Sequence, residues 1–120
     1  MSAKTLLTSE EQSRSIVDVA SDKLASDIVL LDISEVSGFA DFFVIMTADS
    51  DRQISALTED IESAFRSNGR SLHHREGNSE SGWVLLDFSD VIVHILGRDQ
   101  REFYQIEQAW SNAVQVVRIQ

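Results

Sequence analysis

The chain has 120 residues, and 20 Asp and Glu against 10 Lys and Arg give it a formal net charge of -10. Because phosphate backbones and anionic lipids bind clustered cations, this charge argues against direct nucleic-acid or membrane binding as the main activity. Cysteine is absent, which excludes disulfides, thiolate metal ligands and a cysteine nucleophile. We expect a cytoplasmic protein with a single domain over residues 1–120, its core at about 9–110 and an extension at 111–120.

The first part of the chain predicts one helix followed by two strands. Apolar residues recur at helical spacing over 9–26, and Ser9 with Gln12 fits a capping box at the start of that helix. The segments 28–33 and 41–48 are short, rich in β-branched residues and apolar on both faces. Such segments are typical of strands buried in the middle layer of an α/β fold.

A second helix and a third strand are expected next. Ser50 with Gln53 fits another capping box, and an apolar stripe runs from there to an Asn-Gly stop at 68–69. A possible strand follows at 71–75. The polar, glycine-flanked segment 76–82 predicts a loop.

The last part of the chain predicts a hairpin and a third helix. Segments 83–88 and 91–96 are strands joined by a tight connection, which makes them antiparallel. Asp99 with Glu102 is expected to cap the helix that follows. Its predicted apolar face consists of Phe103, Ile106 and Trp110. The tail 111–120 lacks a helical period, and its valines could add a short edge strand.

These elements run in the order α-β-β-α-β-β-β-α. The order predicts an α/β fold with a mixed five-stranded sheet flanked by helices. Because several strands are apolar on both faces, a three-layer arrangement with helices on each side of the sheet is expected.

Catalytic patterns are incomplete in this sequence. A nucleotidyltransferase needs carboxylates that converge on two metal ions, but two residues after Asp41 stands Phe43, where a second acid is required. A metal-dependent nucleotidyltransferase using Asp41 and Asp87 remains an alternative. His94 alternates with apolar residues along its strand, which predicts a half-buried histidine bonded to a neighbour and not a metal ligand. We therefore expect no catalytic residue, no metal and no cofactor.

Aromatic side chains gather on the predicted hairpin and the last helix. Trp83 begins the hairpin, while Tyr104 and Trp110 lie on the helix. Asp87 and Asp90 add carboxylates to the same region. Because Trp and Tyr are common anchors of protein interfaces, this region predicts a docking surface for a basic protein. Self-association of the chain through the same hairpin remains a second alternative.

Five segments of the chain resemble the ribosomal silencing factor (Iojap-like) family. They are DIS at 32–34, ADFFVI at 40–45, SDRQ at 50–53, GWVLLDFSDVIVH at 82–94 and REFYQIEQAW at 101–110. Two positions depart from the family pattern, because Ala48 replaces a usual glycine and Ser89 stands where a turn usually has glycine. Serine makes a positive φ at that turn more costly than glycine would.

The resemblance implies a fold like that of the nucleotidyltransferases without their activity. Members of the family bind ribosomal protein fourteen of the large subunit on the face that meets the small subunit. Occupying that face blocks subunit joining and holds translation down when nutrients are scarce. The contact residues implied for this chain are Trp83, Tyr104, Asp87, Asp90, His94, Arg101 and Trp110.

Overall fold

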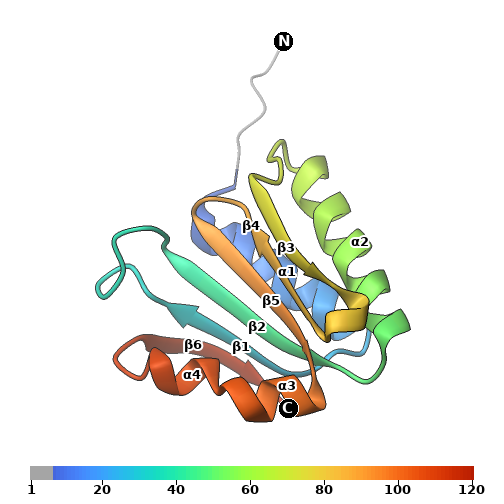
Figure 1. The fold of residues 1–120 in the computed structure, drawn as a ribbon. Coiled ribbons are helices and arrows are strands. Elements are labelled where there is room, and N and C mark those ends of the chain that lie inside the picture. The colour runs from blue at the N-terminus through green and yellow to red at the C-terminus, as the bar shows by residue number, and fades with distance from the viewer. Residues whose placement is uncertain (1–6) are drawn as a thin grey trace.

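The computed structural model describes residues 7–120 and contains a six-stranded mixed sheet with helices on both faces (Figure 1). The strand order is β3-β4-β5-β2-β1-β6, in which β2 and β5 are parallel and the other neighbours antiparallel. The strands are β1 (Ser26–Asp32), β2 (Phe42–Ala48), β3 (His74–Asn78), β4 (Trp83–Asp87), β5 (Val91–Gly97) and β6 (Val114–Ile119). The helical elements are α1 (Ser9–Asp22), α2 (Asp51–Ser67), the 3-10 turn η1 (Ser79–Ser81), α3 (Arg98–Tyr104) and α4 (Ile106–Ala109).

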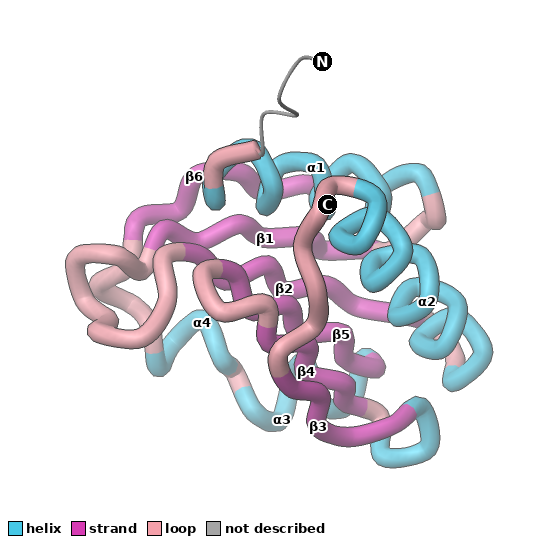
Figure 2. Tube along the Cα trace, turned by 90° about the horizontal axis from the view of Figure 1, so that it is seen from above, coloured by secondary structure: helices cyan, strands magenta, loops and turns pink. Residues whose placement is uncertain are grey.

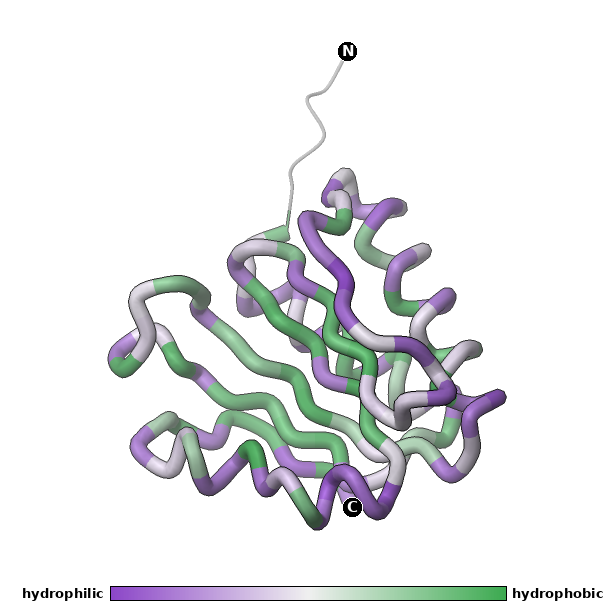
Figure 3. Tube along the Cα trace, in the orientation of Figure 1, coloured by the Kyte–Doolittle hydropathy of each residue, from purple (hydrophilic) through white to green (hydrophobic). Residues whose placement is uncertain are grey.

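The helices form a layer on each side of the sheet. The long helices α1 and α2 pack on one face, while α3 and α4 lie on the other (Figure 2). All seven residues of β2 are buried because both of its faces are covered. Hydropathy follows this layering, with apolar central strands and many polar residues along the helices (Figure 3). The expected three-layer arrangement is confirmed.

Each face of the sheet carries its own apolar core. On the α1 and α2 side, the rings of Phe65 and Phe88 stack with centroids 3.6 Å apart inside a cluster of buried aliphatic residues. On the α3 and α4 side, Phe43 and Ile45 from β2 pack with Ile106 from α4. Full burial of such a side chain contributes roughly 1.5–3 kcal/mol, so both layers are fixed to the sheet by apolar contact.

The sheet has six strands and not the predicted five. The additional strand is β6, formed by the tail that the valines indicated as a possible edge strand. It pairs antiparallel with β1, with Leu30 opposite Val117. Residues of the tail therefore extend the sheet at the edge opposite β3.

The predicted helix boundaries need small corrections. The cap of α1 is Thr8 with Glu11, because both reciprocal capping bonds form there, and not Ser9 with Gln12. The helix ends at residue 22 and not at 26, since Leu24 already has a φ of 65°. Ser50 caps α2 by accepting a hydrogen bond from the N–H of Gln53, but the predicted capping box is incomplete, because the Gln53 side chain accepts from the N–H of Asp49 instead.

Two further predictions differ from the structure. The third strand covers 74–78 and not 71–75, so part of the expected loop at 76–82 pairs with β4. The third helix has no side-chain cap from Asp99, because Gly97 occupies the N-cap position. This helix breaks at Gln105, whose φ is 47°. The break leaves Phe103 79% exposed instead of on an apolar face.

Candidate functional site

Trp83 and Tyr104 meet where the start of β4 approaches the end of α3. Their ring centroids lie 4.6 Å apart with an interplanar angle of 47°. Tyr104 is 50% exposed and Trp83 is half-buried. Together with Leu85 they line a pocket of about 290 Å³, to which Glu76 also contributes. The two predicted anchors thus form one partly exposed aromatic pair beside a pocket.

Glycines allow β4 and α3 to come this close. Gly82 directly precedes Trp83 with a φ of 78°, and a Cβ there would lie 2.5 Å from the side chain of Gln100. Gly97 precedes α3, and a Cβ there would lie 2.7 Å from the same side chain. The N–H of Gly97 donates to the carbonyl of Gly82 at 2.9 Å. A larger residue at either position would force the end of the Gln100 side chain to move, and at Gly82 the positive φ would add backbone strain.

Rings continue from Trp83 across the sheet in an aromatic row. The His94 ring lies 5.9 Å from that of Trp83 and 4.8 Å from that of Phe43. Phe43 in turn meets Trp110 at 5.0 Å in an edge-on arrangement. The row ends at Phe39, which is 58% exposed and 5.8 Å from Trp110. The third predicted aromatic contact, Trp110, thus lies at the other end of the row from Tyr104.

His94 lies inside the row and not on the surface. It is 5% exposed, and its Nδ1 accepts a hydrogen bond of 3.2 Å from Nε1 of Trp83. The predicted bond to a neighbour is confirmed, although the histidine is more deeply buried than expected. Burial first, and then the positive charge of Arg101, lower the pKa of His94 to about 4. Its ring is therefore neutral at physiological pH and is not accessible for direct contact.

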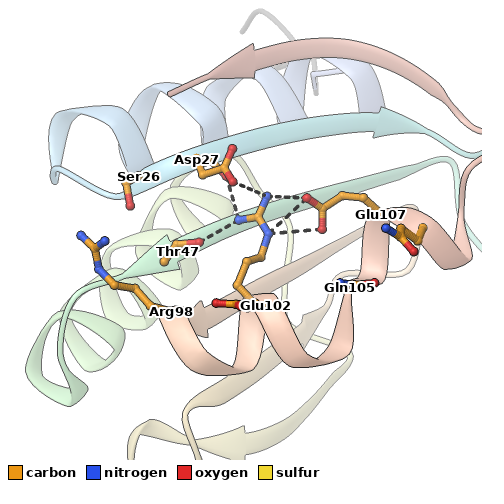
Figure 4. A pocket seen from close by; sticks show the side chains of 9 residues that line it. Ser26, Asp27, Thr47, Arg98, Glu102, Gln105 and Glu107 are labelled. Atoms are coloured by element: carbon orange, nitrogen blue, oxygen red, sulfur yellow. Dashed lines mark hydrogen bonds and ion pairs between the residues drawn. The ribbon is translucent and has the colours of Figure 1, made fainter.

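Arg101 is also buried, and its guanidinium is bonded within the protein. It donates to the carbonyl of Asp27 at 2.8 Å, to Oγ1 of Thr47 at 2.9 Å and to Oε2 of Glu107 at 2.8 Å. Figure 4 shows these residues converging in a pocket of about 490 Å³. Burial alone would raise the pKa of Glu107, but hydrogen bonds from Arg101 and its charge hold that pKa below its ordinary value. Arg101 therefore links α3 and α4 to the sheet. Because its side chain is buried, it is not available for direct contact with a partner.

The predicted acids lie at the far end of β4 from Trp83. Asp87 is half-buried on the same sheet face as Trp83, since the two are four residues apart in one strand. Its Oδ1 accepts a 2.7 Å bond from the N–H of Ser89. Asp90 is exposed and forms an ion pair of 3.4 Å with Arg70. These two carboxylates are therefore separated from the aromatic pair by the length of the strand.

The acids of the enzyme alternative are held by different partners. Asp41 accepts a hydrogen bond from Ser9 on α1 at 3.2 Å, whereas Asp87 binds the backbone of its own turn. Within residues 7–120, no three histidine or acidic side chains come close enough to hold a metal ion.

In the same range, no helix combines the length and the apolar character that crossing a membrane requires.

Sequence reasoning missed four residues that lie beside the pair or along the aromatic row. Phe103 touches Tyr104 edge-on at 5.0 Å and is largely exposed, although helical periodicity placed it in the core. Leu85 and Glu76 line the pocket from neighbouring strands. Phe39 follows a glycine in a loop, where no period signals its exposure. Only the alternation along β4 could have placed Leu85 beside Trp83.

Comparison with known proteins identifies similar chains over nearly the whole length. Residues 7–120 match the family model described as ribosomal silencing factor during starvation. The ribosomal silencing factor of Bacillus subtilis is 38% identical over 104 residues, which cover 83% of this chain and 88% of that protein. The chloroplastic protein Iojap of Zea mays is 35% identical over 105 residues, covering 85% of this chain and 44% of that protein.

The fold is also similar to a solved structure. A crystal structure of a protein from Chromobacterium violaceum superposes with a TM-score of 0.83 at 30% sequence identity. The match covers 88% of this chain and 88% of that one.

Proposed function

This chain belongs to the ribosomal silencing factor family, and we propose that it silences translation by binding the large ribosomal subunit. In this proposal it occupies ribosomal protein fourteen on the face that meets the small subunit, so that the two subunits cannot join. It acts in the cytoplasm by steric occupation, without a catalytic residue, a metal or a cofactor. The proposal includes a fold that resembles that of the nucleotidyltransferases without their activity.

The observation that carries this proposal is the partly exposed pair of Trp83 and Tyr104 beside the pocket lined by Leu85. A half-buried tryptophan and an exposed tyrosine supply large apolar area with few rotatable bonds, as interface anchors do. Each ring restricts the rotation of the other, so little side-chain conformational entropy is lost when a partner covers them. We assign the main contact with the ribosomal protein to this pair.

Charge supports a basic protein as the partner. Glu76 contributes to the same pocket, and Asp87 lies on the same strand face as Trp83. Except for Arg52 and Arg66, every arginine and lysine within residues 7–120 forms an ion pair with a carboxylate. The excess of acids therefore leaves a negative surface, which attracts a basic protein and is repelled by ribosomal RNA.

The seven residues implied by the family resemblance take different parts in this proposal. Trp83 and Tyr104 bind the partner directly, and Asp87 and Asp90 orient it. Trp110 extends the surface along the aromatic row. The two buried members, His94 and Arg101, support the surface from beneath.

The direct test is co-sedimentation of the protein with purified large subunits. Replacing a tryptophan or tyrosine anchor by alanine commonly costs about 2 kcal/mol or more, which is about 30-fold in affinity. We expect this loss for Tyr104→Ala and a larger one for the double variant Trp83→Ala/Tyr104→Ala. Because Tyr104 is 50% exposed, its replacement should leave the unfolding transition close to that of the wild type.

Val114→Ala is the matched control. Val114 is 60% exposed on β6, which three strands separate from β4, so this variant should bind like the wild type. Undiminished co-sedimentation of a folded Tyr104→Ala variant would contradict the site assignment.

Sedimentation equilibrium of the free protein tests the alternative of self-association. In that alternative the protein is a dimer, and the same Tyr104→Ala substitution would dissociate it.

A further inference from the structure

Trp83 is held from the inside of the protein by one polar contact. Its indole Nε1–H donates to Nδ1 of His94 at 3.2 Å. The outer side of the indole meets Tyr104 at 4.6 Å between ring centroids. The orientation of the indole is therefore fixed between a buried acceptor and a partly exposed ring.

His94 is confined to this bond by its surroundings. It lies on β5 with 5% exposure, and Phe43 packs edge-on against its ring at 4.8 Å. Its other nitrogen, Nε2, has no hydrogen-bond partner among the described residues. The bond with Trp83 is thus the one hydrogen bond that this buried side chain makes there, and the ring has little space to turn away.

The bond requires the neutral form of the histidine. Nδ1 accepts a hydrogen bond only when it carries no proton itself, which places the ring proton on Nε2. Burial and the charge of Arg101 lower the pKa of His94 to about 4. At neutral pH the acceptor is accordingly available in essentially every molecule.

We propose that His94 is a positioning residue for the binding surface: its Nδ1 holds the Trp83 indole against Tyr104 in the orientation that the partner meets. His94 itself does not touch the partner. The predicted effect of His94 on ribosome binding rests on the proposed function. The predicted effect of His94 on the orientation of the indole does not.

The test uses three variants that separate the hydrogen bond from packing. His94→Leu fills the space without an acceptor, and His94→Asn returns an acceptor atom close to the position of Nδ1. Phe43→Leu is the matched control, because it removes ring packing from His94 and leaves the bond intact. A merely structural histidine would make all three variants behave alike once they are compared at equal stability.

The readout is the indole N–H signal in nitrogen-15 NMR spectra, where the chain has only two tryptophans. We expect His94→Leu to speed hydrogen exchange at the Trp83 indole by about tenfold, the effect of losing one hydrogen bond. Trp110 serves as the internal reference for the two His94 variants and should not change in them, whereas in Phe43→Leu it loses a ring contact and is not used as a reference. His94→Asn should restore slow exchange, and Phe43→Leu should retain it.

Binding to large subunits is measured on the same samples. His94→Leu should weaken binding by about tenfold while His94→Asn stays near the wild type, in parallel with the indole signal. Unchanged exchange at the Trp83 indole in His94→Leu, or failed rescue by a folded His94→Asn, would overturn the proposal. Should the wild type itself not bind, the proposed function falls, and the NMR comparison still decides the role of His94.

Trp83→Phe gives a reciprocal test that does not depend on the folding of His94→Leu. Removing the donor should shift the Nδ1 resonance of His94, because that nitrogen loses its hydrogen bond. An unshifted resonance would contradict the proposal independently.

Discussion

Ser89 occupies a backbone conformation that serine rarely adopts. Its φ is 76°, in the turn between β4 and β5. The strain of a positive φ in a residue with a Cβ is of order 1–3 kcal/mol, and the bond from its N–H to Asp87 compensates for part of it. Serine at this position therefore holds the turn at a cost in stability.

Ser89→Gly should stabilise the protein by about 0.5–1 kcal/mol. Glycine removes the strain and keeps the N–H bond to Asp87, but it adds freedom to the unfolded chain, which offsets part of the gain. Chemical denaturation measures the difference. Ser71→Gly is the control, since Ser71 lies outside helices and strands with a negative φ, and it should be neutral or slightly destabilising. Equal effects of the two substitutions would show that the turn is not strained.

His94 should make stability depend on pH above the range in which carboxylates titrate. Because its pKa falls from 6.5 to about 4 on folding, the unfolded chain binds more protons between these values, and stability is lost as the pH falls through them. The expected loss between pH 7 and pH 5 is ~1.5–2 kcal/mol. Glu107 has a lowered pKa, so its contribution is lost only at more acidic pH.

The measurement is the free energy of unfolding of the wild type and of His94→Asn over this range. The variant lacks the titrating ring and should show the shallower pH profile. Parallel profiles would mean that His94 is not the group responsible.

At the scale of elements, Arg101 links two helices, α3 and α4, that are too short to be stable in isolation. The helices α3 and α4 have seven and four residues, well below the length at which isolated helices persist. The guanidinium links α3 to Glu107 of α4, to Asp27 of β1 and to Thr47 of β2. The position of Tyr104, at the end of α3, depends on this network.

Arg101→Met should destabilise the protein by about 2–4 kcal/mol, because it leaves Glu107 and Asp27 without their buried cation. Arg98→Met is the matched control. Arg98 pairs with Asp49 in an exposed site, so its loss should cost less than about 1 kcal/mol. Urea denaturation compares the two variants. Similar losses for both would show that the buried network contributes no more than a surface pair.

The elements that sequence reasoning predicted are those whose pattern reflects burial. The segments at β1, β2 and β5 read as strands because helices cover both faces and most inward positions are apolar, with Thr47 and His94 as buried polar exceptions. β3 has no buried residue, so no hydropathy period marks it, and its place is fixed by pairing with β4. The break at Gln105 depends on a positive φ in a residue that rarely adopts one.

The candidate site was predictable to a similar extent. Aromatic type and family resemblance selected Trp83 and Tyr104, which the fold brings together. The burial of Arg101 was not predictable, because its partner Asp27 lies 74 positions earlier in the chain. A long charged side chain is usually exposed, and only tertiary structure shows its charge to be neutralised inside.

For the whole molecule, the net charge of -10 and the aromatic row have to act together. In the proposed mechanism, the carboxylates steer the chain toward a basic protein and away from RNA, and the partly exposed rings hold it there. A large subunit whose joining face is covered in this way cannot accept the small subunit. Binding to the large subunit is therefore only the first step of the proposed mechanism, and the block of subunit joining is the second.

The most direct test is a sucrose gradient of purified ribosomal subunits under joining conditions, with and without saturating protein. The account predicts that the wild type lowers the peak of joined ribosomes, raises the free subunits and migrates with the large one. Folded Tyr104→Ala at the same concentration should leave joining nearly normal, and Val114→Ala should act like the wild type. Subunit joining that is untouched by saturating wild-type protein would contradict the account.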